Sequence, residues 1–135
     1  EALRARDLNV EPELIVEGDF SFDSGVRAAE ELLTRDPRIT AIFASNDDMA
    51  AGILVAAHRR GLRVPDDISV AGFDDVDLSR MVAPALTTVR QPTGAMGRRA
   101  VELLLARLDG VEDATHEEFA TELIVRGSTG LPPTR

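Results

Sequence analysis

The sequence predicts an α/β fold with a doubly wound parallel sheet, because short apolar runs alternate with amphipathic stretches along most of its length. Hydrophobic residues make up 44% of the 135 residues, which is enough for a buried core. No apolar run approaches the roughly 20 residues that a membrane-spanning helix needs. We therefore expect one domain or part of a larger one, with no membrane partner.

The N-terminal part of the chain predicts a helix end, a strand and a helix. Residues 1–8 have the pattern of the end of a helix, with Asn9 as a plausible C-cap. Residues 14–17 (LIVE) predict a short strand. The spacing over Phe22–Arg35 predicts a helix that Ser21 or Asp23 could cap. The apolar face of this helix consists of Val26, Ala29, Leu32 and Leu33.

The middle of the chain predicts two buried strands with a helix between them. The strands are residues 41–44 (AIFA) and 68–71 (ISVA), and the helix is residues 49–60. Gly61 is expected to end the helix at the position just past its C-cap. The inward face of the helix consists of Ala50, Ile53, Leu54 and Ala57.

The C-terminal part changes pattern. Residues 74–81 predict a polar loop or a short helical turn, and residues 86–90 predict an extended run. A break is expected at Gln91 and Pro92, because the residue before a proline is disfavoured in a helix. Residues 94–108 then predict a long helix, residues 119–125 a last strand, and residues 127–135 an irregular tail.

The composition excludes several kinds of site. The chain has no cysteine, so disulfides, thiol catalysis and cysteine-based zinc sites are excluded. All 15 positions counted as lysine or arginine are arginine, which excludes lysine-dependent chemistry. The net charge of −9 repels a phosphate backbone, so this segment should not bind DNA itself. A DNA-binding module elsewhere in a longer chain stays possible.

The residues do not predict an enzyme. His58 lies beside two arginines in a predicted helix, and His116 lies in an acidic turn, so neither predicts a catalytic triad. The sequence has neither a dinucleotide-binding nor a P-loop motif. A magnesium site among the aspartates stays open as an alternative. Apart from that, no cofactor and no metal are expected.

Polar and aromatic residues gather where the predicted strands end. In open parallel sheets, ligands bind beyond the carboxyl ends of the strands. A carboxylate accepts two sugar hydroxyls, an amide both donates and accepts, and a ring covers the apolar face of a sugar. The pattern therefore predicts a site for a polyhydroxylated ligand. The strand ends carry Asp19 and Phe20, then Ser45, Asn46 and Asp47, then Phe73, Asp74 and Asp75, and finally Arg90 and Gln91.

The polar residues of this set also have structural explanations. Asn46 or Asp47 could simply cap the following helix, and for Asp47 the cap is favoured. Asp75 is expected to be solvated or to form a turn. Asp74 favours a ligand, because a strand-end carboxylate is costly to shield unless something pairs with it. Gln91 alone is uninformative.

The aromatic residues divide in the same way. Phe43 and Phe73 are expected to lie in the core. Phe20 is evenly balanced between packing within its loop and stacking on a ligand. It is nevertheless the phenylalanine best placed to supply a ring to the site.

Five motifs in order resemble the lactose/galactose-repressor (LacI/GalR) family of transcriptional regulators. The sequence is similar to the C-terminal part of their effector-binding domain over nearly its whole length. Any one motif is moderately specific, and all five in order are highly specific. The motifs are residues 17–25 (EGDFSFDSG), 41–52 (AIFASNDDMAAG), 61–75 (GLRVPDDISVAGFDD), 84–92 (PALTTVRQP) and 122–128 (ELIVRGS).

This resemblance implies a type I periplasmic-binding-protein-like fold of two doubly wound lobes, incomplete in this chain, with the ligand between the lobes. Residues 1–91 would form the C-terminal lobe, residues 92–122 would belong to the N-terminal lobe, and residues 123–135 would be the return strand and tail. The resemblance also implies a role for four residues. Asp74 matches the sugar-hydroxyl-binding aspartate, Asn46 and Gln91 match ligand contacts, and Phe20 matches the aromatic residue that packs on the ligand.

By the same resemblance, the whole protein would be a cytoplasmic repressor that responds to a sugar or nucleoside-like effector. It would form a homodimer near residues 47–60 and 79–84, and it would bind operator DNA only through a helix-turn-helix that this sequence lacks. It would not be an enzyme. A periplasmic sugar-binding protein of a transport system is the alternative, because it shares the architecture. A purely structural or oligomeric role is a further alternative.

Overall fold

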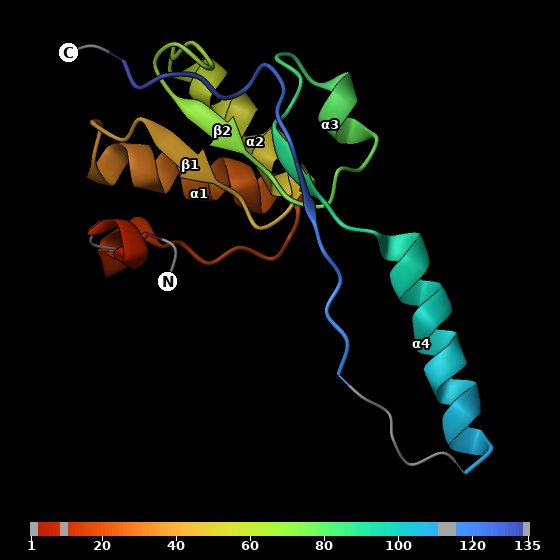
Figure 1. Ribbon diagram of the computed structural model, residues 1–135. Coiled ribbons are helices and arrows are strands. Elements are labelled where there is room, and N and C mark those ends of the chain that lie inside the picture. The colour runs from red at the N-terminus through yellow and green to blue at the C-terminus, as the bar shows by residue number, and fades with distance from the viewer. Residues whose placement is uncertain (1–2, 9–10, 111–115, 134–135) are drawn as a thin grey trace.

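The chain forms a small parallel sheet with helices packed on one face and a long helix standing away from it. The computed structural model describes residues 3–8, 11–110 and 116–133. Figure 1 shows helices α1 and α2 together behind strands β1 and β2, and α4 extending from the layered part. The elements are α1 (Phe22–Arg35), β1 (Ala41–Phe43), α2 (Asp47–Arg59), β2 (Ser69–Ala71), α3 (Leu78–Met81), β3 (Thr88–Arg90), α4 (Thr93–Leu108) and β4 (Glu122–Ile124).

The sheet brings three strand ends to one edge. β1 and β2 are parallel, with Phe43 opposite Ala71. β3 lies parallel on the other side of β2, where the amide of Gly72 donates to the carbonyl of Thr87 at 2.9 Å. β4 pairs antiparallel with β3. Because β1, β2 and β3 run the same way, their carboxyl ends lie at a common edge, as a ligand site of this kind requires.

The two packed helices touch along glycines. A Cβ atom on Gly25 of α1 would lie 2.1 Å from the carbonyl oxygen of Met49 in α2. A Cβ atom on Gly52 of α2 would lie 2.2 Å from the carbonyl oxygen of Phe22 in α1. The two backbones therefore approach more closely than any other residue would allow. This contact fixes α2, and with it the side chains at the start of α2, against the rest of the layer.

The ends of both helices confirm local expectations. The hydroxyl of Ser21 accepts a hydrogen bond from the amide of Ser24, so Ser21 and not Asp23 caps α1. Gly61 follows α2 with φ of +71°, and the amides of Gly61 and Leu62 donate to the carbonyls of His58 and Ala57. This is the Schellman arrangement that favours glycine just past the C-cap.

Two N-terminal expectations are wrong. Residues 14–17 do not form a strand: Pro12–Leu14 is a 3₁₀ helix, and Ile15 is 63% exposed. A strand requires a neighbour for its backbone groups, and no described residue supplies one there. The expected helix end at residues 1–8 is a 3₁₀ helix over Arg4–Arg6, and Asn9 lies outside the described residues.

The tail that follows β4 is irregular, as expected, but it is built into the core. The side chain of Ser128 is fully buried. Its backbone carbonyl accepts from the amide of Val70 at 2.8 Å, and its hydroxyl donates to the carbonyl of Val70 at 2.6 Å. The amide of Thr87 donates to the same hydroxyl at 2.8 Å. The tail therefore bridges β2 and β3 and anchors the returning chain.

Helix α4 stands apart from this core (Figure 1). None of its residues is buried. The apolar face that the sequence predicts for it forms no core in this chain. Exposed apolar side chains on α4 include Met96, Val101, Leu104, Leu105 and Leu108.

We expect Gly25→Ala to lower the free energy of unfolding of the full-length protein by about 2 kcal/mol or more, because the added methyl group meets backbone that cannot move aside. The control is Arg27→Ala on the exposed side of α1, which should change it by less than about 0.5 kcal/mol. Urea unfolding followed by circular dichroism measures both. A Gly25→Ala variant as stable as wild type would show that the helices can separate freely.

Candidate functional site

The end of β2 and the end of β3 place Asp74 and Gln91 together. The side-chain amide of Gln91 donates to Oδ1 of Asp74 at 2.6 Å. The amide of Asp74 donates to the carbonyl of Val89 at 2.9 Å, which fixes the register of the two segments. Both side chains are half-buried. Oδ2 of Asp74 and Oε1 of Gln91 remain as acceptors, so the pair can take hydroxyl groups of a ligand.

A second pair joins the loop before α1 to the start of α2. The side-chain amide of Asn46 donates to the carbonyl of Phe20 at 2.8 Å, and its side-chain oxygen caps α2 by accepting from the amide of Met49 at 2.9 Å. Phe20 has φ of +64° and its side chain is 64% exposed. The ring is thus held at the surface instead of packing in its loop. It is available to cover a ligand.

Asp47 links the start of α2 to the segment that follows Asp74 and to the strand that precedes Gln91. It is the first residue of α2 and is 1% exposed. Its carboxylate accepts from the amide of Val76 at 2.9 Å and from the hydroxyl of Thr88 at 2.5 Å. Gly72 makes room for it, since a Cβ there would lie 2.4 Å from Oδ1 of Asp47. One side chain therefore ties α2 to the loop after Asp74 and to β3.

The environment of Asp47 disfavours its charge. Burial raises the pKa of the Asp47 carboxyl, and the hydrogen bonds from Thr88 and Val76 oppose that shift without cancelling it. The carboxylates of Asp74 and Asp75 raise it further. Among the described residues, Asp47 accepts hydrogen bonds only from neutral donors, which stabilise its charge less than a nearby cation would.

The neighbouring residue Asp75 has the opposite environment. Its side chain is 2% exposed and accepts hydrogen bonds from the guanidinium groups of Arg126 at 2.5 Å and Arg90 at 2.7 Å. The hydroxyl of Ser79 donates to it at 3.1 Å. Burial would raise the pKa of Asp75, but the hydrogen bonds from Arg126, Arg90 and Ser79 outweigh burial and lower it to about 2.

The structure corrects three expectations about this region. Asp47 is not the cap of α2, which is Asn46, because the Asp47 carboxylate turns inward to Thr88. Asp75 is not a solvated residue, because two arginines neutralise it in the interior. Phe43 is not in the core: its side chain is 64% exposed on a strand that helices cover on one face only.

Asp19 lies beside Phe20 and is occupied locally. It accepts hydrogen bonds from the hydroxyl and the amide of Ser21, and it forms an ion pair with Arg27 at 3.5 Å. These hydrogen bonds from Ser21 lower the pKa of Asp19 to about 2. The carboxylate therefore stays charged at neutral pH and holds the turn that presents Phe20.

Comparison with known proteins identifies the family. The sequence model of periplasmic binding protein-like domains matches residues 1–129. The chain belongs to this family. The predicted fold class, a doubly wound α/β lobe that is incomplete in this chain, is thereby confirmed. So is the resemblance to LacI-family regulators, through the relatives described next.

Three relatives illustrate the match. The HTH-type transcriptional repressor CytR of Escherichia coli K12 is 42% identical over 134 residues, which cover 98% of this chain and 39% of the repressor. A structure of a transcriptional regulator CelR–cellobiose complex is 40% identical with a TM-score of 0.86, covering 94% of this chain and 39% of that one. A LacI-family regulatory protein from Chloroflexus aggregans is 37% identical with a TM-score of 0.84, covering 96% of this chain and 47% of that one.

The periplasmic binding protein-like chain thus spans 39% of the length of CytR. Within the part that the structure describes, no helix combines the length and apolar character needed to cross a membrane. Over the same residues, no group of three or more histidine, aspartate or glutamate side chains is arranged to hold a metal ion.

We expect Asp47→Asn to gain stability relative to wild type as the pH rises. A carboxyl whose pKa is raised by folding stabilises the protein most below its unfolded pKa, near 3.8, and loses that contribution as pH rises through the folded pKa. Asparagine keeps the shape and carries no charge. Free energies of unfolding of the full-length protein, measured from about pH 4 to about pH 8, should therefore shift in favour of the variant.

The matched control is Asp77→Asn, two residues beyond Asp75 and 79% exposed. It removes the same carboxylate charge at an exposed position, so comparing the two variants isolates the effect of burial. If the free energies of unfolding of Asp47→Asn and wild type instead differ by the same amount at every pH measured, folding does not raise the pKa of Asp47.

Proposed function

We propose that this chain is the C-terminal part of the effector-binding and dimerisation domain of a transcriptional repressor that responds to a sugar or nucleoside-like molecule. The observation that carries the proposal is the Asp74–Gln91 pair at the carboxyl edge of the sheet. Its free acceptor atoms suit hydroxyl groups, and the exposed ring of Phe20 suits the apolar face of a sugar. The relative that was solved with cellobiose supports a sugar as the effector.

Asn46 completes the proposed set of ligand contacts. Its side-chain amide donates to the carbonyl of Phe20 at 2.8 Å, so it holds the backbone of the residue that carries the ring. Together the four residues Phe20, Asn46, Asp74 and Gln91 form two hydrogen-bonded pairs, linked through Asp47. A ligand held between the pairs would contact groups from four separate segments, which is how such clefts obtain specificity.

The division of the chain into lobes remains part of the proposal. Residues 1–91 would form the C-terminal lobe, residues 92–122 would belong to a second lobe, and residues 123–135 would return to the first. The detached position of α4 and its exposed apolar side chains support this, because such a face normally packs against further protein. The fixed position of Ser128 supports the return of the tail.

The proposed protein is a homodimer that binds operator DNA through a helix-turn-helix elsewhere in its chain. Met81 of α3 is 76% exposed. An open groove of about 470 Å³ lies nearby, lined by residues of α2 and of the segment after α3, including Leu54, His58, Ala83 and Pro84. These are the surfaces on which the resemblance places the dimer contacts.

The relatives favour a repressor over the alternatives. CytR is an HTH-type transcriptional repressor, which supports a regulator that works on DNA in the cytoplasm. The net charge of −9 is compatible with this role only if another module contacts DNA. The full protein would then be a two-state switch, in which effector binding between the lobes changes the affinity for operator DNA.

We expect Asp74→Ala to weaken effector binding by about 30–100-fold, equivalent to about 2–3 kcal/mol, because charge-assisted hydrogen bonds are lost. A thermal-shift screen of the full-length protein against sugars and nucleosides would first identify the effector. Titration calorimetry then compares wild type, Asp74→Ala and the control Asp77→Ala. Wild-type affinity in Asp74→Ala would refute the assigned role of Asp74.

We expect Met81→Asp to shift the full-length protein from dimer toward monomer, because a charge at the centre of an apolar contact must be desolvated. The control is Leu131→Asp, which alters an apolar side chain that is 89% exposed in the tail. Size-exclusion chromatography with light scattering reads both. If Met81→Asp stays fully dimeric at low micromolar concentration, the dimer surface lies elsewhere.

A further inference from the structure

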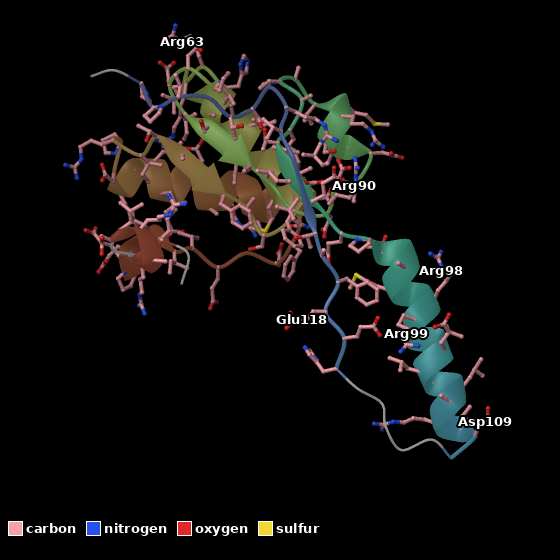
Figure 2. The ribbon with its side chains drawn as sticks, viewed as in Figure 1. Arg63, Arg90, Arg98, Arg99, Asp109 and Glu118 are labelled. Carbon is pink, nitrogen blue, oxygen red and sulfur yellow. The ribbon has the colours of Figure 1, made fainter. Side chains whose placement is uncertain are left out.

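The two segments that connect the sheet to the region of α4 meet at one buried carboxylate. Arg90 is the last residue of the outgoing strand β3, and Arg126 follows the returning strand β4. Both guanidinium groups donate to Asp75, one to each carboxylate oxygen. Figure 2 shows Arg90 where β3 leaves the layered part toward α4. The Asp75 side chain thus bonds to both connecting segments. We call Asp75, Arg90 and Arg126 together the clamp.

Both arginines of the clamp donate further hydrogen bonds to neighbouring residues. Besides Asp75, Arg126 donates to the hydroxyl of Ser79 at 3.0 Å and to the carbonyl of Leu86 at 2.8 Å. Arg90 also donates to Glu122 of β4 at 3.0 Å, opposite it in the ladder. Arg90 is the more exposed of the two arginines: its side chain is 46% exposed, whereas the Arg126 side chain is 14% exposed.

The clamp is adjacent to the proposed ligand contacts at both ends. Asp75 follows Asp74, and Arg90 precedes Gln91 in the sequence. The backbones of Asp74 and Asp75 both have positive φ, +109° and +57°, a conformation that residues other than glycine rarely adopt. Such a conformation persists only where surrounding contacts hold it. The hydrogen bonds of Asp75 to Arg90, Arg126 and Ser79 are among the contacts that hold it.

We propose that Asp75 is a positioning residue of the ligand site, which through Arg90 and Arg126 keeps Gln91 in register with Asp74. It touches no ligand itself. The inference rests on the proposed function only in taking Asp74 and Gln91 as ligand contacts. The energetic logic is that of a buried ion pair, which stabilises little overall but is costly to break on one side.

Hydrogen–deuterium exchange of the full-length protein, read by mass spectrometry, tests the clamp without any ligand. In Asp75→Asn we expect the amides of Asp74 and Arg126 to exchange about tenfold faster than in wild type, as their segments loosen. Peptides from α1 and α2 should keep their wild-type rates. The control Asp77→Asn should leave all of these rates unchanged.

A second pair of variants guards against misfolding of Asp75→Asn. Arg90→Met removes one half of the clamp at a half-exposed position and should also speed exchange at Asp74, whereas Arg90→Lys keeps the charge and should restore most of the protection. Wild-type exchange at Asp74 in both Asp75→Asn and Arg90→Met would overturn the proposal. So would equally faster exchange throughout α1 and α2, which would indicate general destabilisation.

Two further results distinguish a failure of this inference from a failure of the proposed function. A crystal structure of Asp75→Asn in which Gln91 still donates to Asp74 within hydrogen-bond distance would overturn the positioning role, whatever the protein binds. Absence of binding by the wild-type protein to every sugar and nucleoside in the thermal-shift screen would instead count against the proposed function, with the exchange result unaffected.

Discussion

A buried carboxylate, Asp75, where the sheet connects to the region of α4 constrains the rest of this structure. Removing Asp75 from water is unfavourable unless positive charge accompanies it. Arg90 and Arg126 supply that charge from the two segments that connect the layered part to α4. Because both arginines donate to Asp75, movement of either segment would remove part of the positive charge that pairs with this buried carboxylate. The register of β3 against the loop after β2 depends on this arrangement, and so does the Asp74–Gln91 contact.

Three aspartates within this small region behave differently because their neighbours differ. Asp75 has cationic donors, and its pKa falls to about 2. Asp47 has neutral donors and is almost completely buried, and its pKa rises. Asp74 is half-buried beside an amide, with acceptor capacity left over. Residue type alone therefore does not assign a role. The one carboxylate that retains unused acceptors at an accessible edge is the one suited to a ligand.

Local sequence information predicted what local physics determines. The 3.6-residue spacing located α1, and the glycine after α2 located its end, because both signals lie within a few residues. The rule that the carboxyl ends of parallel strands share an edge predicts that Asp74 and Gln91 lie together, as they do. The burial of Asp75 was missed, since its partner Arg126 lies 51 residues away. The strand at residues 14–17 was wrong because pairing depends on a neighbour that the described chain does not provide.

If the proposed function holds, the position of Gln91 couples ligand binding to the angle of the segments that connect the sheet to α4. Its amide is bonded to Asp74, and its backbone continues directly from Arg90 into the break before α4. A ligand hydroxyl that bonds to Oδ2 of Asp74 adds to the Gln91 hydrogen bond at Oδ1, whereas one that bonds to Oδ1 competes with Gln91. Either event acts on a residue whose neighbour is clamped to Asp75. By linkage, any angle of the connecting segments that favours the bonded arrangement must raise ligand affinity, and the ligand must favour that angle by the same free energy.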